Sequence, residues 1–521
     1  MKKKYTVRFL YIISSILYLS FTQCEQNKRF QSLIPNIQNP SPDYYCTWQV
    51  QHFYTNAIGT NEMRANITES NMFDGGKFQN WVDFYPEARQ DLIFVMDDSW
   101  DIPFKYTNEY GSLILSSDKF PSFANDSISN KDALKALTTA VKSKGWKGLG
   151  GWVWAGESEM FINNMSPEDY WIERAKWANY SGFSYWKVDW GKKIYDYDFR
   201  KQITDISHKY APGLNVENAQ IDGVIPVSDV FRTYDVPAIM SIPMTMDKLK
   251  HTLGKYTAKD GYNGLINCED EVYTAAALGC TMGVMRHPFT GNMPNGKPDM
   301  SWPSMHRNIK SKIDEITRAV RWHRIAPAFS VNASETIIDS TMLTDTWVLQ
   351  DSPSEIEDWW FKPWTGLHIH GDTISESGPA RIARRLPLPK VVPDENGDLP
   401  YVVASKNPNG AVSIATLGRT HNRKYWIPKC DITIYVTDAG TYGIFGRYNR
   451  LTLQTNLNLK EATILAQDLA GKVVVDITSK VIVEGGSLIV PGSLIDQIGT
   501  SEQNPNDTSE PGLVLVIMGS E

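Results

Sequence analysis

The segment SYWKVDWG, residues 184–191, is the part of the sequence that indicates the fold most directly. Residues 184–189 form a short run in which Tyr185, Trp186 and Val188 are apolar, and Lys187 and Asp189 stand at its carboxyl end. A strand that is apolar on both faces is typical of a buried parallel sheet. Residues 167–181, just before this run, carry apolar side chains at helical spacing behind a Ser-Pro start. The two segments therefore predict one helix and one strand of a parallel α/β fold.

The same alternation runs from residue 45 to residue 325. Predicted strands lie at 46–51, 92–96, 147–154, 184–189, 213–216, 229–233, 264–267 and 281–285. Predicted helices lie at 78–90, 131–143, 167–181, 195–210, 244–256, 270–278 and 305–323, and the crossover after Val216 has no clean helix. Eight units in a row predict a (β/α)₈ TIM barrel, and a doubly wound open sheet is the competing architecture.

The pattern changes after about residue 328, where short runs rich in Val, Ile and Thr are separated by Gly, Asn, Asp and Pro. These runs predict a C-terminal antiparallel β-sandwich. The predicted strands are 401–405, 411–417, 432–436, 441–445, 451–454, 462–467, 472–477, 487–490 and 513–518. We expect a signal peptide at 1–23, a catalytic barrel at 24–330 and the β-sandwich domain at 331–521.

Length and composition agree with an ordinary globular protein of more than one domain. The chain has 521 residues, 42% hydrophobic and 21% charged, so extensive disorder is excluded. Its net charge of −7 gives no electrostatic reason to expect nucleic acid as a partner. The 17 Trp, 24 Tyr and 19 Phe suit a surface that stacks sugar rings, although most of them are expected in the core.

The N-terminus predicts export. Three lysines follow Met1, and an apolar run from about Phe9 to Phe21 precedes Cys24. This order is typical of a secretory signal peptide and is too short for a spanning helix, and no later run is long enough to span a bilayer. Cys24 raises the alternative of a lipid-anchored protein, so the chain is expected in the periplasm, at the cell surface or free outside the cell.

Two carboxylates stand at the expected carboxyl ends of barrel strands, where barrel enzymes hold their reactive groups. Asp189 follows the fourth strand and Asp235 the sixth, so the two could face each other across a sugar ring. Glycoside hydrolysis needs such a pair, one acid to attack the anomeric carbon and one to protonate the leaving oxygen. Lys187 projects from the same strand face as Asp189 and favours its ionised form. The pair predicts a glycosidase.

Further candidates for sugar binding follow the second and third strands. Asp97 and Asp98 can accept hydrogen bonds from sugar hydroxyls, and Trp100 and Trp152 can offer apolar platforms. The series from His368 to Asp372 imitates a metal motif, but alternate residues of one strand face produce it by chance, so no metal is assigned. The scheme requires no cofactor.

The order of these motifs resembles clan D glycoside hydrolases, and it is most similar to family 27, the α-galactosidase family. The resemblance covers about residues 45–325 and implies a barrel, a trailing β-sandwich, Asp189 as nucleophile and Asp235 as acid/base. It also implies substrate-binding roles, for Trp48, Asp97, Asp98, Lys187, Glu217 and Arg232.

The sequence departs from the family pattern at three places. The family usually has its acid/base four residues after the arginine, whereas Asp235 is three after Arg232. Trp190 and Gly191 replace a cysteine that follows the nucleophile, and the motif after strand seven is only echoed at residues 267–270. The sequence still predicts an exported retaining exo-α-glycosidase that acts on an oligosaccharide or polysaccharide, and an α-galactosidase is the first choice. The alternatives are a β-L-arabinopyranosidase, an α-N-acetylgalactosaminidase or an α-glucosidase on the same scaffold, a non-catalytic glycan-binding protein, and a metal-dependent hydrolase.

Overall fold

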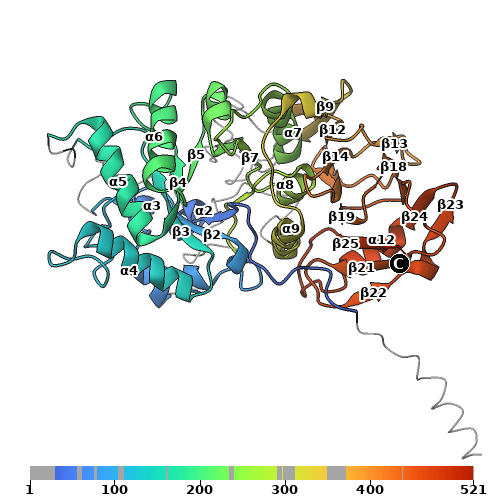
Figure 1. Cartoon of the computed structure of the whole chain (residues 1–521), viewed down its shortest axis with the longest axis horizontal. Coiled ribbons are helices and arrows are strands. Elements are labelled where there is room, and N and C mark those ends of the chain that lie inside the picture. Colours follow the sequence, from blue (N-terminus) through green and yellow to red (C-terminus); the bar gives the residue numbers. More distant parts are fainter. Residues whose placement is uncertain are drawn as a thin grey trace, which may run out of the picture.

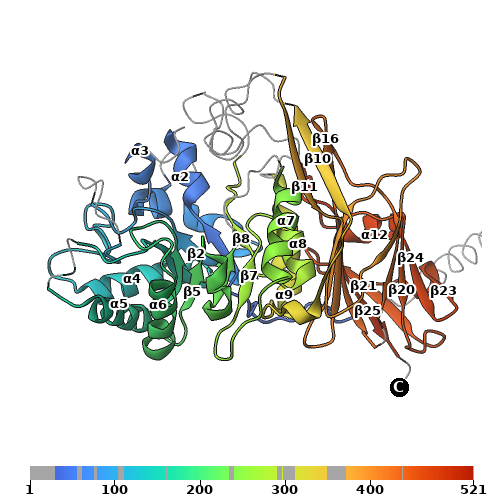
Figure 2. The same ribbon diagram turned by 90° about the horizontal axis from the view of Figure 1, so that it is seen from above.

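A computed structural model shows two parts that lie side by side, an α/β part and a C-terminal β part (Figures 1 and 2). The structure describes residues 30–55, 61–75, 79–103, 111–159, 162, 164–233, 240–289, 296, 311–348, 371–436 and 438–519. All statements below concern these residues.

The α/β part is built on eight parallel strands. They are β1 (Tyr44–Cys46), β2 (Ile93–Met96), β3 (Gly148–Val153), β4 (Phe183–Val188), β5 (Asn215–Asn218), β6 (Val230–Arg232), β7 (Leu265–Asn267) and β8 (Gly283–Val284). The pairing order is β7-β6-β5-β4-β3-β2-β1-β8, and a parallel bridge between Asn267 and Thr281 joins β7 to the start of β8. This closure confirms the predicted TIM barrel and excludes the open sheet.

Helices surround the barrel (Figure 1). They are α2 (Trp48–Thr55), α3 (Asn61–Arg64), α4 (Asn130–Ser143), α5 (Pro167–Ser181), α6 (Tyr197–Tyr210), α7 (Ser241–Leu253), α8 (Val272–Leu278) and α9 (Ile313–Ile325). The Ser166 side chain accepts a hydrogen bond from the Asp169 amide at the start of α5, as expected of a helix cap. After β5 the chain forms only a 3₁₀ helix, Asp222–Val227, which confirms that this crossover lacks a regular α-helix.

Two predicted elements of the barrel are wrong. Residues 46–51 were expected as a strand, but β1 ends at Cys46 and α2 begins at Trp48. The chain turns there because the Thr47 hydroxyl accepts a hydrogen bond from the Asp97 amide, at 2.8 Å, and the Thr47 carbonyl accepts one from Gln51. Residues 78–90 were expected as a helix, but their described part holds two short 3₁₀ helices, Trp81–Asp83 and Arg89–Asp91. Pro86 disfavours helical geometry at the residue before it, and Tyr85 has φ of +49°.

The C-terminal part consists of an eight-stranded and a five-stranded sheet, with a separate apolar core between them, and of two further sheets of two strands each. Most strand pairs are antiparallel, as predicted, and three are parallel: β12 with β14, β15 with β19, and β18 with β20. Its elements are β9 (Thr336–Ile338), β10 (Met342–Val348), β11 (Thr373–Pro379), β12 (Arg381–Arg384), β13 (Lys390–Val392), β14 (Tyr401–Lys406), β15 (Val412–Leu417), β16 (Arg419–His421), β17 (Lys424–Trp426), β18 (Asp431–Tyr435), β19 (Thr441–Phe445), β20 (Arg450–Gln454), β21 (Thr463–Asp468), β22 (Val474–Asp476), β23 (Ile482–Glu484), β24 (Ser487–Pro491), α12 (Gly492–Gly499) and β25 (Gly512–Met518).

Buried polar side chains connect the two parts. The Arg384 guanidinium, on β12, donates hydrogen bonds to the carbonyls of Leu278 and Gly279 at the end of α8. Arg318, on α9, binds both carboxylate oxygens of Asp468 at 2.9 and 3.1 Å. Such hydrogen-bonded buried charges fix the register of one part on the other. In the ranges that the structure describes, no helix is both long and apolar enough to pass through a bilayer.

Candidate active site

Asp189 is the first residue after β4, and its carboxylate lies at the mouth of the barrel. The side chain is almost buried, because the residue is only 7% exposed. Trp152, on β3, donates its indole N–H to Asp189 Oδ2 at 3.1 Å, and Arg232 Nη2, on β6, lies 3.0 Å from Asp189 Oδ1. Side chains from two other strands therefore fix the position of both carboxylate oxygens.

The charges around Asp189 keep its carboxylate ionised. Burial acts to raise the pKa of Asp189, but the positive charges of Arg232 and Lys187 and the hydrogen bond from Trp152 outweigh it. The pKa of Asp189 is therefore held below its ordinary value. An anionic, oriented and nearly desolvated carboxylate is the form that a nucleophile requires.

Lys187 and Asp97 form a buried ion pair beside this carboxylate. The Lys187 ammonium lies 2.7 Å from Asp97 Oδ2, and both side chains are buried. Burial acts to lower the pKa of Lys187, but the charge of Asp97 outweighs it and holds this pKa well above its ordinary value. The Cys46 thiol and the Asp98 amide also donate to Asp97, each at 2.7 Å. Asp97 is thus held by protein groups and sets the position of Lys187.

Asp98 lies next to this pair and has partners of its own. Arg64, on α3, donates to Asp98 Oδ2 at 2.9 Å, and the Ser99 hydroxyl donates to Oδ1 at 2.7 Å. Burial raises the pKa of Asp98 above its ordinary value, although Arg64 opposes the rise. The helix α3 therefore brings a cation over the end of β2.

Arg232 is the centre of the site, because three carboxylates surround its guanidinium. Besides Asp189, it contacts Glu217 Oε1 and Glu269 Oε1, each at 3.5 Å, and it is 1% exposed. Glu269 follows β7, and sequence reasoning did not assign it a role. Its position after a barrel strand and next to the strand of Arg232 was the signal that could have identified it.

Glu217, on β5, lies deeper in the barrel than Asp189 and is 1% exposed. Its Oε2 accepts hydrogen bonds from the Tyr185 hydroxyl at 2.8 Å and from the Asn267 amide at 2.7 Å. Burial raises the pKa of Glu217 despite the opposing charge of Arg232. Glu217 therefore connects Arg232 to the side chains of Tyr185 and Asn267.

The tryptophans occupy different environments. Trp152 contacts Asp189 directly. Trp48 is half-buried at the start of α2, and the centroid of its ring lies 4.5 Å from that of His52. Trp100 was expected to face the sugar, but it is fully buried, and its indole N–H donates to the Trp152 carbonyl at 3.0 Å. It fits there because Gly151 leaves room, since a Cβ at Gly151 would lie 2.8 Å from the Trp100 indole nitrogen. Trp100 belongs to the barrel core.

Several residues lie elsewhere. Asp235, the expected acid/base, is outside the described residues, and so are His368 and His370. Asp229 immediately precedes β6. It accepts hydrogen bonds from the Val216 amide at 3.1 Å and contacts His208 Nε2 at 2.6 Å, at the opposite end of the barrel.

Comparison with known proteins gives similarities to solved structures only, since no family model and no curated protein matches the chain. One similar structure is a β-L-arabinopyranosidase of glycoside hydrolase family 27 from Geobacillus stearothermophilus. It is 10% identical, with a TM-score of 0.40 over 92% of this chain and 97% of that one. Another is described as a putative α-galactosidase from Bacteroides fragilis, 11% identical, with a TM-score of 0.38 over 92% of this chain and 79% of that one.

A third is described as a putative α-N-acetylgalactosaminidase from Bacillus halodurans. It is 8% identical, with a TM-score of 0.38 over 94% of this chain and 99% of that one.

Proposed function

We propose that the protein is a retaining exo-α-glycosidase, with α-galactosides as its preferred substrates. The observation that carries the proposal is the environment of Asp189, a nearly buried carboxylate at a barrel mouth that Arg232 and Trp152 orient and whose pKa they help to hold low. A carboxylate prepared in this way is suited to attack an anomeric carbon.

In the proposed mechanism, Asp189 attacks the anomeric carbon while Asp235 protonates the leaving oxygen. The glycosyl–enzyme bond that forms on Asp189 is then broken by a water molecule, which Asp235 deprotonates. The cations Arg232 and Lys187 keep the nucleophile anionic before attack. When Asp189 becomes an ester, its charge is lost, and Arg232 remains neutralised by Glu217 and Glu269.

The remaining residues of the site would bind the sugar. Lys187 and Arg232 can donate to ring hydroxyls, and Asp98 can accept from them, because charged partners make strong hydrogen bonds with hydroxyls. Trp152 and Trp48 can supply apolar contact to the ring at the barrel mouth. Asp97 and Glu217 are more deeply engaged with protein donors, so we propose that Asp97 acts on the sugar through Lys187, and Glu217 through Arg232.

A panel of nitrophenyl glycosides tests this function. We expect hydrolysis of the α-galactoside, with the α-anomer as the first product in proton NMR, and unchanged rates in chelator. A β-anomer as first product contradicts the retaining mechanism. Turnover of the β-L-arabinopyranoside or the α-N-acetylgalactosaminide alone would keep the mechanism and change the sugar, and binding without turnover would identify a glycan-binding protein.

We further propose that the chain is exported, on the basis of its basic and then apolar N-terminus. Mass spectrometry of the mature protein tests this, because cleavage near residue 23 leaves Cys24 as a new N-terminal residue. A mass increase by acyl groups on that residue would identify a lipid anchor, and an intact N-terminus in the mature protein would contradict export by cleavage.

A further inference from the structure

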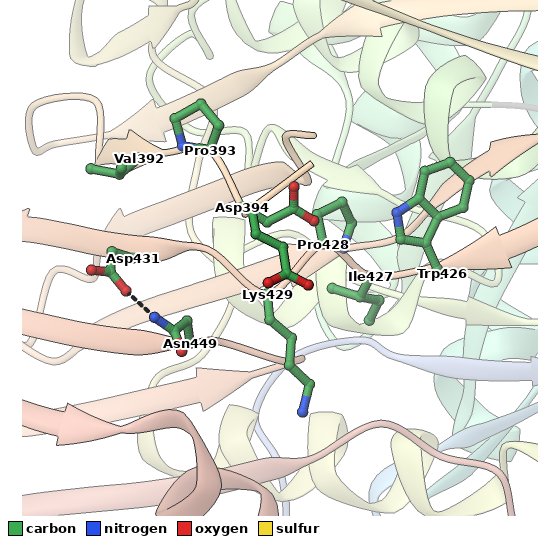
Figure 3. A pocket seen from close by; sticks show the side chains of 10 residues that line it. Val392, Pro393, Asp394, Trp426, Ile427, Pro428, Lys429, Asp431 and Asn449 are labelled. Carbon is green, nitrogen blue, oxygen red and sulfur yellow. Dashed lines mark hydrogen bonds between the residues drawn. The ribbon is translucent and has the colours of Figure 1, made fainter. Parts of the chain in front are cut away.

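A pocket of about 530 Å³ lies in the C-terminal β part, and the proposed catalytic site uses none of its residues. One wall is the turn that follows the edge strand β13, and the other is the segment that follows β17. Its polar side chains come from the starts of β18 and β20 as well as from the turn. Figure 3 shows the Trp426 ring on one side, the Asp431–Asn449 pair on the other, and Asp394 between them.

The turn at residues 394–398 is fixed by its own hydrogen bonds. Asp394 Oδ1 accepts from the backbone amides of Asn396 and Asp398, both at 2.9 Å. The opposite wall contains Pro428, which is buried and has a restricted backbone. Both walls are therefore formed before any ligand binds, and a preformed pocket loses little entropy on binding.

Trp426 gives the pocket an aromatic face. Its side chain is half-buried, and its indole N–H has no acceptor among the described residues. The Lys424 ammonium lies 5.8 Å from the ring centroid. An aromatic ring that lies in a pocket wall beside hydrogen-bonding groups suits the apolar face of a sugar ring.

The charges of the pocket select against an anionic ligand. Lys429 is paired with Asp496 at 2.9 Å, and Asp431 already accepts hydrogen bonds from Asn449 and Arg450. Within the described ranges, Asp394 and Glu395 have no ion-pair partner, so their carboxylates leave the pocket with excess negative charge. Ionised carboxylates accept strong hydrogen bonds from hydroxyl groups. A neutral, hydroxyl-rich ligand therefore fits better than a uronate or a sulfated sugar.

We propose that this pocket binds a neutral sugar unit, stacked on Trp426 and hydrogen-bonded to Asp394, Glu395 and Asn449. Its volume is within the range of small-molecule sites. The binding itself needs no catalysis; only its role, holding the protein on the glycan that it degrades, rests on the proposed function. Two linked sites on one chain would raise the effective substrate concentration at the barrel.

Affinity gel electrophoresis of the full chain tests the pocket, with galactomannan, arabinogalactan and β-glucan as neutral probes and polygalacturonate as the anionic probe. We expect retardation by at least one neutral glycan and none by polygalacturonate. Trp426→Ala should weaken the apparent affinity at least fivefold. The matched control is Tyr435→Ala, because Tyr435 is an exposed aromatic residue of β18 outside the pocket, and it should behave as the wild type.

Hydrolysis of a nitrophenyl glycoside separates the two proposals. Trp426→Ala should leave this rate unchanged, because the small substrate needs only the barrel site. Trp426-dependent retardation without any hydrolysis would retain the pocket and reject the proposed function. Equal retardation of Trp426→Ala and wild type, or no retardation of the wild type by the neutral glycans, would overturn the pocket proposal.

Discussion

Arg232 Nη2 lies 3.0 Å from Asp189 Oδ1, while the other nitrogens of the same guanidinium face Glu217 and Glu269. One buried cation is thus shared by three carboxylates, Glu217 on β5 and the two that follow β4 and β7. The proposed nucleophile has the shortest of the three contacts. Arg232 therefore connects Glu217 and Glu269 to the carboxylate of Asp189.

Replacing Asp189 tests the nucleophile. We expect Asp189→Asn to lower kcat to below about one-thousandth of the wild-type value, because the amide cannot form the glycosyl–enzyme bond. Thermal unfolding should stay close to the wild type, since Asn can still accept from Trp152. The control is Asp198→Asn, an exposed position on α6, which should keep full activity. Normal turnover in Asp189→Asn would refute the assignment.

Asp235→Ala tests the acid/base assignment. The rate on a nitrophenyl glycoside should fall by about 10²–10⁴-fold and fall less with a dinitrophenyl leaving group, which needs little protonation. Azide should restore turnover and give a glycosyl azide of the same anomeric configuration as the substrate, because azide replaces water in the second displacement. A product of opposite configuration would instead indicate a lost nucleophile.

Arg232→Lys tests the electrostatic role of the shared cation. Arg232 helps to hold the pKa of Asp189 below its ordinary value, so the wild-type acid limb of kcat/KM should lie below the ordinary carboxyl range of about pH 4. Lysine has one compact ammonium in place of the planar guanidinium, whose separate nitrogens reach the three carboxylates, so it cannot keep the same contact with Asp189. The pKa of Asp189 should therefore rise, and the acid limb should move to higher pH. Arg450→Lys, at an exposed site, should leave the profile unchanged. An unmoved limb in Arg232→Lys would show that Arg232 does not set this pKa.

Asp270 gives a prediction on stability. Burial raises its pKa to about 7, against the opposing charge of Arg286, so the folded protein keeps a proton that the unfolded chain has lost between about pH 4 and 7. Ionisation of the unfolded chain therefore destabilises the folded state progressively over this range, and the penalty is constant above pH 7.

Asp270→Asn should accordingly raise the free energy of unfolding at pH 8, by about 2–4 kcal/mol, and have little effect at pH 4. Asparagine tolerates the positive φ of 55° at this position and can still accept from the Met285 amide. Chemical denaturation at the two pH values measures the difference, with the exposed Asp222→Asn as control. Equal effects at both pH values would contradict the raised pKa.

The sequence was sufficient to predict those features of the site that depend on residues close together in the chain. Lys187 and Asp189 could be placed on one face at one strand end because side chains alternate along a strand. The order of strands and acids also brought Glu217 and Arg232 into the same site, where the structure has them in contact.

Other features depend on contacts between distant residues and could not be predicted. The role of Glu269 comes from a contact with Arg232, 37 positions earlier in the chain. Trp100 is in the core because Gly151, on another strand, leaves space for its ring. The helix expected at 78–90 is absent from its described part because Pro86 disfavours helical geometry at Tyr85, which here has a φ of +49°.

The end of α8 receives its hydrogen-bond donors from the C-terminal β part. A helix leaves its last carbonyls without partners, and here they are satisfied from the β part, where Ser405 and Ser413 donate to Ala277, and Arg384 donates to Leu278 and Gly279. The loop that carries Glu269 lies directly before α8. Removal of the C-terminal β part would therefore leave this loop of the candidate site attached to a helix whose last carbonyls have lost their partners. A chimera that joins this barrel to a different C-terminal domain would need side chains that donate hydrogen bonds to the same carbonyls of α8, as Arg384, Ser405 and Ser413 do here.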